Sequence, residues 1–457
     1  MEKKNYIVAI DLGSSNVVVM IGSKGEGGKV HIDDVAVKEV EGMMRGEIKN
    51  IELVARSIKE AVTELEERLS IRIAEAYTGI SGQHIKCAKH SYYVFVGRDG
   101  EINREDVEKL NESMRNVHAP EGEKILHIIP QNYIIDDKEE VADPVGMFGR
   151  KLEATFNFVL GENVHLSRLE NALTRMGIRQ AQMYINPLVS SEAVVLPDER
   201  ELGVAVVDIG AGTSDVTIYY DKIVRHVGVV PLGADAINRD IRAQGILERY
   251  VEDLKIKYGG AIAENAAEKV IKVPGRTPRE PKEISFYTLA ATIEARLQDI
   301  FDFVMKEIRQ AGYENKLAAG MVLTGGCAQL QDIDRMAKNY TGLDVRIASP
   351  EASVDEESFV VAEDTRFSAA VGILKKGLEN NRTSTVEPVR RISTPGAGQA
   401  AAAPGLNKTQ PVADPPEVPD GDDPPKLPRK NPFSKLIGGI KDIFEGTMVD
   451  DDTDTKI

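Results

Sequence analysis

The sequence has no excess of positive charge. It contains 57 Lys and Arg against 73 Asp and Glu, which gives a formal net charge of −16. Sequence-independent binding to DNA or RNA depends on Lys and Arg side chains that neutralise phosphates. We therefore predict no nucleic-acid partner.

Cysteine and histidine are also scarce. The two cysteines, Cys87 and Cys327, lie far apart and form neither a disulfide framework nor a zinc motif. The seven histidines show no ligand spacing, since His84 and His90 are six residues apart and would not share one helical face. We expect a reduced, cytoplasmic protein without a structural metal.

Long hydrophobic runs are missing as well. A membrane-spanning helix needs about 20 apolar residues, and no such window occurs. The first residues, MEKKNYIVAIDLG, enter a strand-like run without the apolar core and small-residue cleavage site of a secretory signal. We expect neither a membrane span nor a signal peptide.

The 457 residues are 42% hydrophobic, enough for two or three domains. Up to residue 380, strand-like runs alternate with helical patterns, which predicts an α/β protein. Strands are predicted at 6–10, 17–22, 203–210, 215–220 and 320–326, and helices at 51–69 and 284–312.

Residues 84–162 read as a separate inserted unit of strand, helix, strand and strand. The helix is predicted to start after Asn103, because Asn is a good N-cap and acidic residues follow it. Residues 381–430 differ sharply, with 10 Pro and no aromatic residue. Such a segment buries too little apolar surface to offset its ordering entropy, so we predict a disordered linker.

Two segments resemble each other. Residues 7–19 read IVAIDLGSSNVVV and residues 204–217 read VAVVDIGAGTSDVT. Asp11 aligns with Asp208 and Gly13 with Gly210. The turn residues Ser14, Ser15 and Asn16 align with Ala211, Gly212 and Thr213.

The residue types of both segments suit phosphate and magnesium. Gly and small hydroxyl residues let backbone N–H groups approach phosphate oxygens, and an Asp at a strand end can hold Mg²⁺ through water. One such turn could need Gly and Ser for geometry alone. Two of them, about 200 residues apart, predict duplicated lobes that hold one ligand from both sides.

Two further segments are compatible with nucleotide binding. MVLTGGCAQL (321–330) places Gly325 and Gly326 after a strand, where they suit a turn against a flat base or an ordinary strand–helix turn. VEDLKIKYGG (251–260) places Glu252 and Lys255 one helical turn apart, which also suits a surface ion pair.

These elements, in this order, resemble the actin-like ATPase superfamily, and within it the FtsA family of bacterial cell division proteins. The resemblance covers residues 5 to about 378. It is carried by RELGVAVVDIGAGTSDVTIY, by VPGRTPREPKEISFYTLAATIEARLQDIF followed by LAAGMVLTGGCAQL, and by the inserted unit.

The resemblance implies an actin-like two-lobe fold. The first lobe would comprise 1–83 and 163–200, the second 201–380, and the FtsA-type insert 84–162. It also implies ATP and Mg²⁺ as ligands, with Asp11 and Asp208 near the metal through water. The implied nucleotide contacts are Asp11, Gly13, Ser14, Ser15, Asn16, Asp208, Gly210, Gly212, Thr213, Glu252, Lys255, Gly325, Gly326 and Cys327, the last as a small lining residue.

The segment between the lobes affects the expected hydrolysis rate. Relatives that hydrolyse ATP well carry a Gln or Glu there that orients water, whereas this chain has Asn186 before Pro187. Glu192 is the nearest carboxylate. Loss of such a group costs about 10²–10⁴-fold in rate. We therefore expect ATP binding with weak or absent hydrolysis, and no catalytic residue is assigned.

The last segment of the chain is amphipathic. On a helix over 431–448, the apolar side chains fall within about 120° of arc, and Lys441 lies at the boundary. This predicts a helix that lies in a membrane interface, although docking on the core or on a partner groove is the alternative. The predicted membrane-binding residues are Phe433, Leu436, Ile437, Ile440, Lys441, Ile443 and Phe444. The acidic tail, 449–457, would weaken attraction to anionic lipid.

The resemblance implies a division-site protein on the cytoplasmic side of the bacterial inner membrane. It would form filaments with itself, bind the C-terminal peptide of FtsZ and recruit later division membrane proteins. The FtsZ peptide would dock on the second lobe near Arg276, Arg279 and Arg296. The alternatives are an ATP-dependent pilus-assembly adaptor and a small-molecule kinase of the same superfamily.

Overall fold

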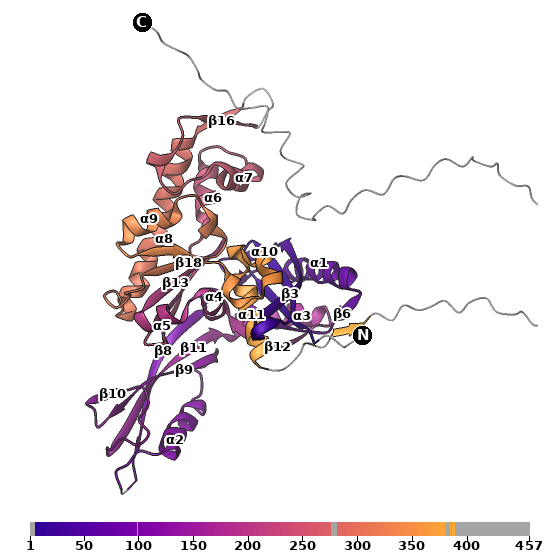
Figure 1. The fold of residues 1–457 in the computed structure, drawn as a ribbon. Coiled ribbons are helices and arrows are strands. Elements are labelled where there is room, and N and C mark those ends of the chain that lie inside the picture. Colours follow the sequence, from indigo (N-terminus) through magenta and orange to yellow (C-terminus); the bar gives the residue numbers. More distant parts are fainter. Residues whose placement is uncertain (1–4, 98, 276–280, 381–383, 385, 389–457) are drawn as a thin grey trace, which may run out of the picture. The chain divides into compact units, whose positions relative to one another are not determined.

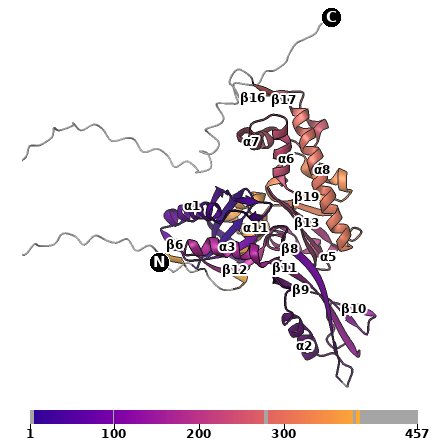
Figure 2. The same cartoon turned by 180° about the vertical axis from the view of Figure 1, so that it is seen from behind.

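The computed structural model describes residues 5–97, 99–275, 281–380, 384 and 386–388. Two five-stranded sheets form the centres of the two lobes (Figures 1 and 2). The first has the order β12-β7-β1-β2-β3, with β1 at Ile7–Leu12, β2 at Asn16–Lys24, β3 at Val30–Glu39, β7 at Glu75–Ile80 and β12 at Arg179–Ile185.

The second sheet repeats the first. Its order is β15-β14-β13-β18-β19, with β13 at Val204–Ile209, β14 at Ser214–Tyr220, β15 at Ile223–Val230, β18 at Met321–Thr324 and β19 at Val345–Ile347. In both sheets the central strand is antiparallel to the next strand and parallel to the strand on its other side. The predicted duplication is confirmed at the level of sheet topology.

The central strands β1 and β13 are apolar except for one aspartate each, Asp11 and Asp208, because helices cover both faces of the sheets. Every residue of β1 is buried, as expected for a strand enclosed on both sides. In the first lobe, α1 (Ile51–Leu69) and α11 (Ser368–Glu379) contact the sheet. In the second, α8 (Phe286–Ala311) contacts β14 and β15. Between the sheets runs α4 (Asn186–Val194), which is buried at nearly every position.

The helix predicted at 284–312 begins later than expected. Residues Lys282–Ser285 form β17, which pairs with β16 (Val270–Val273). The Ser285 hydroxyl accepts a hydrogen bond from the Thr288 N–H at 3.0 Å and so caps the helix. The helix ends at Gly312, whose φ of 80° is left-handed, as a C-terminal glycine allows.

Residues 384–388 also differ from the prediction, which placed them in the linker. Residues Val386–Pro388 form β20, antiparallel to β6 (Ile71–Ile73). The Ser384 hydroxyl accepts a hydrogen bond from the Val8 N–H at 3.0 Å. An edge strand offers unpaired backbone groups, and this short segment satisfies some of them. The rest of the predicted linker, the amphipathic helix and the acidic tail lie outside the described residues.

The inserted domain has the predicted strand, helix, strand and strand, and the short β10, which was not predicted, lies between the last two strands. Its strands are β8 (Ile85–Phe95), β9 (Glu123–Ile135), β10 (Glu139–Val141) and β11 (Lys151–Glu162), in the sheet order β10-β9-β11-β8. The helix α2 (Arg104–Arg115) starts with a capping box between Asn103 and Asp106, so the predicted N-cap is confirmed. Its Leu110 and Met114 pack against this sheet.

The insert also contacts the second lobe. Asn157 donates a hydrogen bond to the Arg225 carbonyl at 2.7 Å, and Gln131 donates one to the Val224 carbonyl at 2.9 Å. Both acceptors lie on β15, the edge strand of the second sheet. The insert therefore links the lobe that carries it to the other lobe.

The remaining elements connect these units. They are β4 (Met43–Met44), β5 (Glu47–Ile48), α3 (Asn163–Arg175), α5 (Pro197–Leu202), α6 (Ala234–Ala243), α7 (Glu248–Tyr258), α9 (Ile333–Thr341), α10 (Phe359–Ala362) and the 3-10 helices η1 (Glu26–Gly28), η2 (Ala263–Asn265), η3 (Gly326–Gln329), η4 (Pro350–Ser353), η5 (Glu356–Ser358) and η6 (Thr365–Phe367). Among the described residues, no helix combines the length and apolar character needed to cross a membrane.

Candidate nucleotide site between the lobes

The two predicted phosphate loops have the same backbone geometry. In the β1–β2 turn, the Gly13 N–H donates to the Asn16 carbonyl at 3.0 Å. In the β13–β14 turn, the Gly210 N–H donates to the Thr213 carbonyl at 2.9 Å. Gly13 is needed for this turn, because a Cβ there would lie 2.8 Å from the Asn16 carbonyl oxygen. The sequence alignment of the two loops thus reflects one repeated structure.

Both loops present unpaired backbone N–H groups. Among the described residues, the N–H groups of Ser14, Ser15, Ala211 and Gly212 have no backbone acceptor. Successive unpaired N–H groups in a tight turn are a recurrent anion-binding arrangement. The loop geometry therefore fits phosphate oxygens on both sides of the cleft.

The loops touch each other across the two lobes. A Cβ on Gly212 would lie 2.3 Å from the Ser14 Oγ and 3.0 Å from the Arg45 Cα, so only glycine fits. The Ser14 Oγ accepts a hydrogen bond from the Gly46 N–H at 2.8 Å. The duplicated loops therefore meet at one place in the fold.

The second loop is supported by the start of α6. The Ala234 N–H donates to the Gly210 carbonyl at 3.0 Å, and the Asp235 N–H donates to the Ala211 carbonyl at 2.8 Å. These bonds use the carbonyl groups of the loop and leave its N–H groups free. The helix start thus fixes the loop without competing for a ligand.

Asp11 lies at the end of β1 and is buried. Its Oδ1 accepts a hydrogen bond from the Asn186 Nδ2 at 2.8 Å. Burial raises the pKa of Asp11 to about 7, an effect that the Asn186 hydrogen bond reduces and the neighbouring Asp208 increases. A cation would favour the ionised form and satisfy this buried carboxylate.

Asp208 is the counterpart of Asp11 on β13. Burial raises the pKa of Asp208 to about 6, and the Ser190 hydroxyl beside it lowers the pKa. A Cβ on Gly325 would lie 2.2 Å from the Asp208 Oδ1, and Gly325 has a left-handed φ of 86°. Gly325 is therefore required by both conformation and space, and it brings the Gly-Gly turn against Asp208.

A third carboxylate was not predicted from the sequence. Asp215 on β14 accepts a hydrogen bond of 2.5 Å from the Ser81 hydroxyl of the first lobe. Burial raises the pKa of Asp215 well above its ordinary value, and Asp208 and Asp11 raise it further. The only available signal was the TSD triplet after the second loop, which does not reveal a partner 134 residues away. The site thus gathers the buried Asp11 and Asp215 and the partly exposed Asp208, a donor set suited to a hydrated Mg²⁺.

The predicted adenosine side lies on α7 and η3. Lys255 is buried and forms an ion pair of 2.8 Å with the exposed Glu252, which also accepts a hydrogen bond from Asn238 at 2.6 Å. Cys327 is buried beside this pair. Burial raises the pKa of Cys327 to about 12, with a lowering effect from Lys255. Cys327 is thus a neutral thiol, as a lining residue requires.

Gly326 and Glu192 are the other residues that were singled out from the sequence. Gly326 begins η3, where a Cβ would meet the Arg366 side chain at 3.5 Å. Glu192, the carboxylate nearest to Asn186 in sequence, forms an ion pair of 2.6 Å with Lys376 of α11. On the interlobe helix, Asn186 therefore contacts Asp11, whereas Glu192 has another partner.

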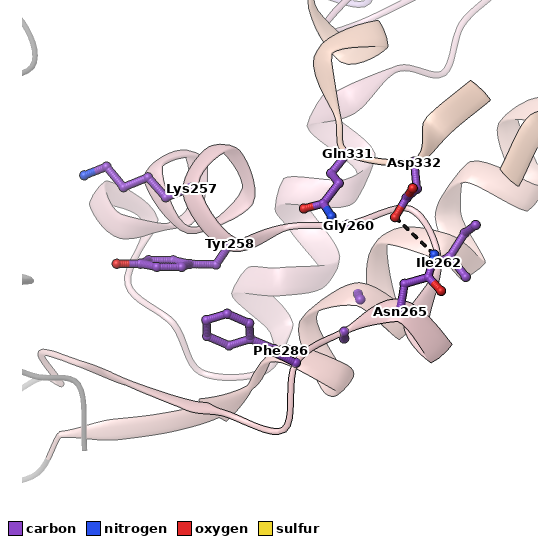
Figure 3. A pocket seen from close by; sticks show the side chains of 11 residues that line it. Lys257, Tyr258, Gly260, Ile262, Asn265, Phe286, Gln331 and Asp332 are labelled. Carbon is purple, nitrogen blue, oxygen red and sulfur yellow. Dashed lines mark hydrogen bonds between the residues drawn. The ribbon is translucent and has the colours of Figure 1, made fainter. Parts of the chain in front are cut away.

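The second lobe also carries a pocket at the end of α7 and the start of α8 (Figure 3). The Tyr258 and Phe286 rings lie 5.4 Å apart, and Asn265 donates a hydrogen bond to Asp332 at 3.1 Å. Of the predicted docking residues, Arg296 on α8 pairs with Asp240 at 2.7 Å and Asp299 at 2.9 Å. Arg276, Arg279 and the predicted membrane-binding residues lie outside the described residues.

Comparison with known families gives two matches. Residues 82–160 match the SHS2 domain inserted in FTSA, and residues 205–372 match the family described as cell division protein FtsA. The first match coincides with the inserted four-stranded sheet and α2, and the second with most of the second lobe.

Individual relatives agree. The chain is 34% identical to the cell division protein FtsA of Pseudomonas aeruginosa over 381 residues, which cover 83% of this chain and 91% of the relative. It is 31% identical to that of Escherichia coli K12 over 399 residues, covering 85% and 94%. A solved PilM-PilN type IV pilus biogenesis complex includes a chain with a TM-score of 0.58 at 15% identity, covering 81% and 98%, which shows a shared fold alone.

The predicted fold class is confirmed: two duplicated α/β lobes of the actin-like type carry a small inserted domain. The family match describes residues 82–160 as an SHS2 domain inserted in FTSA, which agrees with the observed insert. The chain belongs to the FtsA family of cell division proteins.

Proposed function

We propose that this division protein binds ATP with Mg²⁺, assembles into filaments on the cytoplasmic face of the bacterial membrane, and tethers FtsZ there. The observation that carries the nucleotide part is the contact between Gly212 and Ser14, which brings two anion-binding turns together across the cleft. A ligand held between them would favour the closed arrangement of the lobes, and closure would favour assembly.

In this proposal each loop contributes backbone N–H groups to phosphate oxygens. Ser14 and Ser15 act from the first lobe, and Gly212 and Thr213 from the second. Mg²⁺ would be held through its waters by Asp11 and Asp208, and would neutralise phosphate charge. Glu252 and Lys255 would face the ribose and adenine, next to the Gly-Gly turn.

Hydrolysis is proposed to be slow. Asn186 contacts Asp11, and an amide cannot take a proton from an attacking water as a carboxylate can. Glu192 is paired with Lys376 and would have to leave that partner to serve as a base. The bound nucleotide would then act mainly by keeping the lobes closed.

Membrane attachment is proposed for the segment 431–448. Its apolar side chains, seen in the sequence as Phe433, Ile440 and Phe444 among others, suit an interfacial helix. One such helix binds reversibly, whereas many helices on one filament bind far more tightly because linked sites raise the effective concentration. Filament assembly and membrane binding would therefore reinforce each other.

FtsZ is proposed to dock on the second lobe through its C-terminal peptide. Phe286 lines the pocket directly after β17, and Arg276 and Arg279 lie between β16 and β17 in the sequence. Arg296 would contribute to the docking site only if it released its ion pairs with Asp240 and Asp299. The exposed aromatic residues of β8, such as Tyr93 and Phe95, are proposed to contact neighbouring subunits or later division proteins.

Liposome co-sedimentation with ATP tests the proposal. The full chain should pellet with vesicles of mixed anionic and zwitterionic lipid, and pelleting should steepen as the protein concentration rises. An Ile440→Glu/Phe444→Glu variant should stay in the supernatant. A matched Asp450→Lys/Asp451→Lys variant, which changes charge beyond the apolar face, should still pellet. Equal pelleting of the full chain and the Ile440→Glu/Phe444→Glu variant would contradict membrane attachment by this segment.

A further inference from the structure

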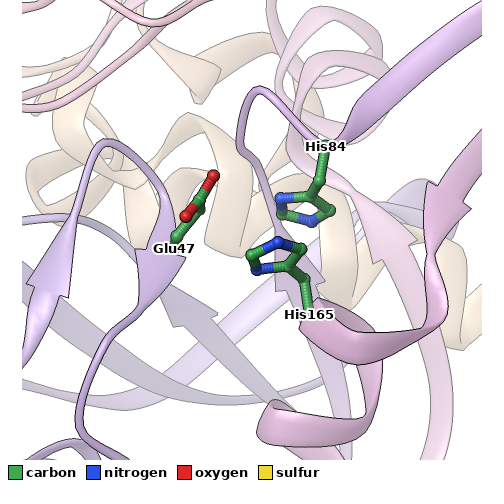
Figure 4. A group of neighbouring side chains, drawn as sticks. All are labelled: Glu47, His84 and His165. Carbon is green, nitrogen blue, oxygen red and sulfur yellow. The ribbon is translucent and has the colours of Figure 1, made fainter.

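Three side chains of metal-ligand type gather behind the first phosphate loop, outside the nucleotide site. Glu47, His84 and His165 each offer one ligand atom, and these atoms lie within 4.8 Å of one another. Figure 4 shows the carboxylate beside the edges of the two imidazoles. The three residues are 37 and 81 positions apart in the sequence, so no spacing motif reveals them.

Their polar atoms are buried and largely unpaired. His84 is 2% exposed, and among the described residues neither of its ring nitrogens has a hydrogen-bond partner. The Nδ1 of His165 is also buried without a partner. Buried polar groups are nearly always satisfied, so two imidazoles with free nitrogens side by side indicate a missing ligand.

The state of the two rings suits ligation. They stack with centroids 4.6 Å apart, which two charged imidazolium rings would resist. Neutral imidazole is the form in which histidine binds a metal.

Surrounding residues orient two of the three ligands, Glu47 and His165. Gln83 donates a hydrogen bond of 2.7 Å to the Glu47 Oε1, and Lys49 pairs with the Oε2 at 2.5 Å. The Nε2 of His165 lies 3.6 Å from the Glu162 Oε2. A carboxylate behind a ligating histidine is a common outer-shell arrangement that fixes the ring. The free Nδ1 of His165 remains for an ion.

We propose that Glu47, His84 and His165 bind a first-row divalent transition ion, for which Zn²⁺ is the best fit. Two imidazoles and one carboxylate suit such ions, whereas Mg²⁺ and Ca²⁺ prefer oxygen ligands throughout. Bonds of about 2.0–2.1 Å at tetrahedral angles would bring the donor atoms to about 3.3 Å from one another, which requires a small inward tilt of the rings. A water would complete the fourth position.

The position of the cluster gives the ion a structural role. His84 lies where the chain enters the insert, between β7 and β8, and His165 lies in the first turn of α3, where the chain leaves it. Glu47 follows Gly46, whose N–H donates to the Ser14 hydroxyl of the first phosphate loop. The ion would link the two chain connections of the insert, at His84 and His165, to the segment that carries Glu47. This link does not depend on whether ATP binds.

Metal binding by the untagged full-length protein tests this. After chelator treatment and desalting, the protein is loaded with Zn²⁺ or Co²⁺ in excess Mg²⁺, desalted again, and analysed for bound metal and for the visible absorption of Co²⁺. We expect one equivalent and a tetrahedral Co²⁺ spectrum. His84→Gln and His165→Gln should each weaken binding by tenfold or more, and Zn²⁺ should raise the melting temperature of the wild type but not of these two variants.

Three controls separate the outcomes. His127→Gln removes a partly exposed histidine outside the cluster, whose Nε2 atom is buried and unpaired, and should still bind one equivalent of metal. Cys87→Ser removes the thiol three residues after His84 and should also still bind one equivalent of metal. Glu47→Gln preserves the shape if a histidine variant fails to fold, and should also lose binding. No saturable equivalent in the wild type, meaning that an ordered water alone fills the site, would overturn the proposal, as would equal binding by Glu47→Gln.

Discussion

Asn186 donates a hydrogen bond of 2.8 Å to Asp11, and this bond joins the interlobe helix α4 to the strand that leads into the first phosphate loop. The amide fits tightly, since a Cβ on Gly79 would lie 2.3 Å from the Asn186 Oδ1. That oxygen is buried and has no partner among the described residues. A cation bound near Asp11 would therefore act directly on the hydrogen bond between Asp11 and Asn186.

Replacing Asn186 with Ala should weaken Mg²⁺-dependent nucleotide binding. The hydrogen bond lowers the pKa of Asp11, so its loss makes the carboxylate harder to ionise. A hydrogen bond to a charged group contributes about 1.5–3 kcal/mol, which corresponds to roughly ten- to hundredfold in Kd. Titration with a fluorescent ATP analogue, with and without Mg²⁺, measures this.

Asn380→Ala is the matched control for that experiment. Asn380 caps the end of α11 and donates a hydrogen bond to the Tyr184 hydroxyl on β12 at 2.6 Å. Neither residue belongs to the phosphate loops, so loss of this hydrogen bond should leave the nucleotide Kd unchanged. Equal Mg²⁺-dependent affinity for Asn186→Ala and wild type would show that Asp11 does not depend on the amide.

Gly212→Ala should open the contact between the two loops. The added Cβ would lie 2.3 Å from the Ser14 Oγ, a distance that real contacts do not reach. We expect nucleotide affinity to fall at least tenfold. Ser14→Gly in the same chain should restore part of it, because the clashing atoms are gone while the Arg45 Cα at 3.0 Å remains.

A comparison of four proteins therefore tests the loop contact. Gly97→Ala is the control, since nothing lies within 4 Å of the Cβ it would add. If Gly212→Ala binds nucleotide as tightly as Gly97→Ala, the contact is not needed for binding. If Ser14→Gly fails to improve Gly212→Ala at all, the defect arises elsewhere in the loop.

The His226–Glu307 pair predicts a pH-dependent contribution to stability. The two atoms lie 3.0 Å apart, between β15 and α8. Burial opposes the charge on His226, but the Cys87 thiol and Glu307 raise its pKa to about 9. A histidine whose folded pKa is raised stabilises the fold fully below about pH 6.5 and loses this contribution as the pH rises through 9.

Glu307→Gln should therefore lower the free energy of unfolding by about 1 kcal/mol at pH 6.5 and by much less at pH 9.5. Urea unfolding at several pH values measures the difference. Glu314→Gln is the control, since Glu314 pairs with Arg309 at 3.0 Å and arginine does not titrate in this range. A Glu307→Gln defect that is equal at both pH values would contradict a charged His226.

The features that were predictable from the sequence are the ones that the chain encodes locally. The two phosphate loops share Asp, Gly and small turn residues in register, so their equivalence was visible without a structure. The capping box at Asn103 and the Gly312 stop were visible for the same reason. Each of these depends on residues that are a few positions apart.

The missed features depend on contacts between distant residues. Ser81 and Asp215 meet only because the two lobes face each other. Glu47, His84 and His165 meet only because the chain leaves the first lobe for the insert and returns from it at one place. The start of α8 was misplaced because residues Lys282–Ser285 pair with β16, and tertiary pairing overrides a helical pattern. No local pattern reports such pairings.

The pocket beside Phe286 predicts where FtsZ binds, if the proposed tether is correct. Phe286 lines the pocket with its ring 5.4 Å from that of Tyr258, whereas Tyr287, its neighbour in the sequence, is exposed and outside the pocket. A buried aromatic anchor typically costs more than 1–2 kcal/mol when truncated, so Phe286→Ala should weaken binding of a fluorescent FtsZ C-terminal peptide by about tenfold. Tyr287→Ala should leave the fluorescence anisotropy titration unchanged. Equal peptide affinity for both variants would place the FtsZ contact outside this pocket.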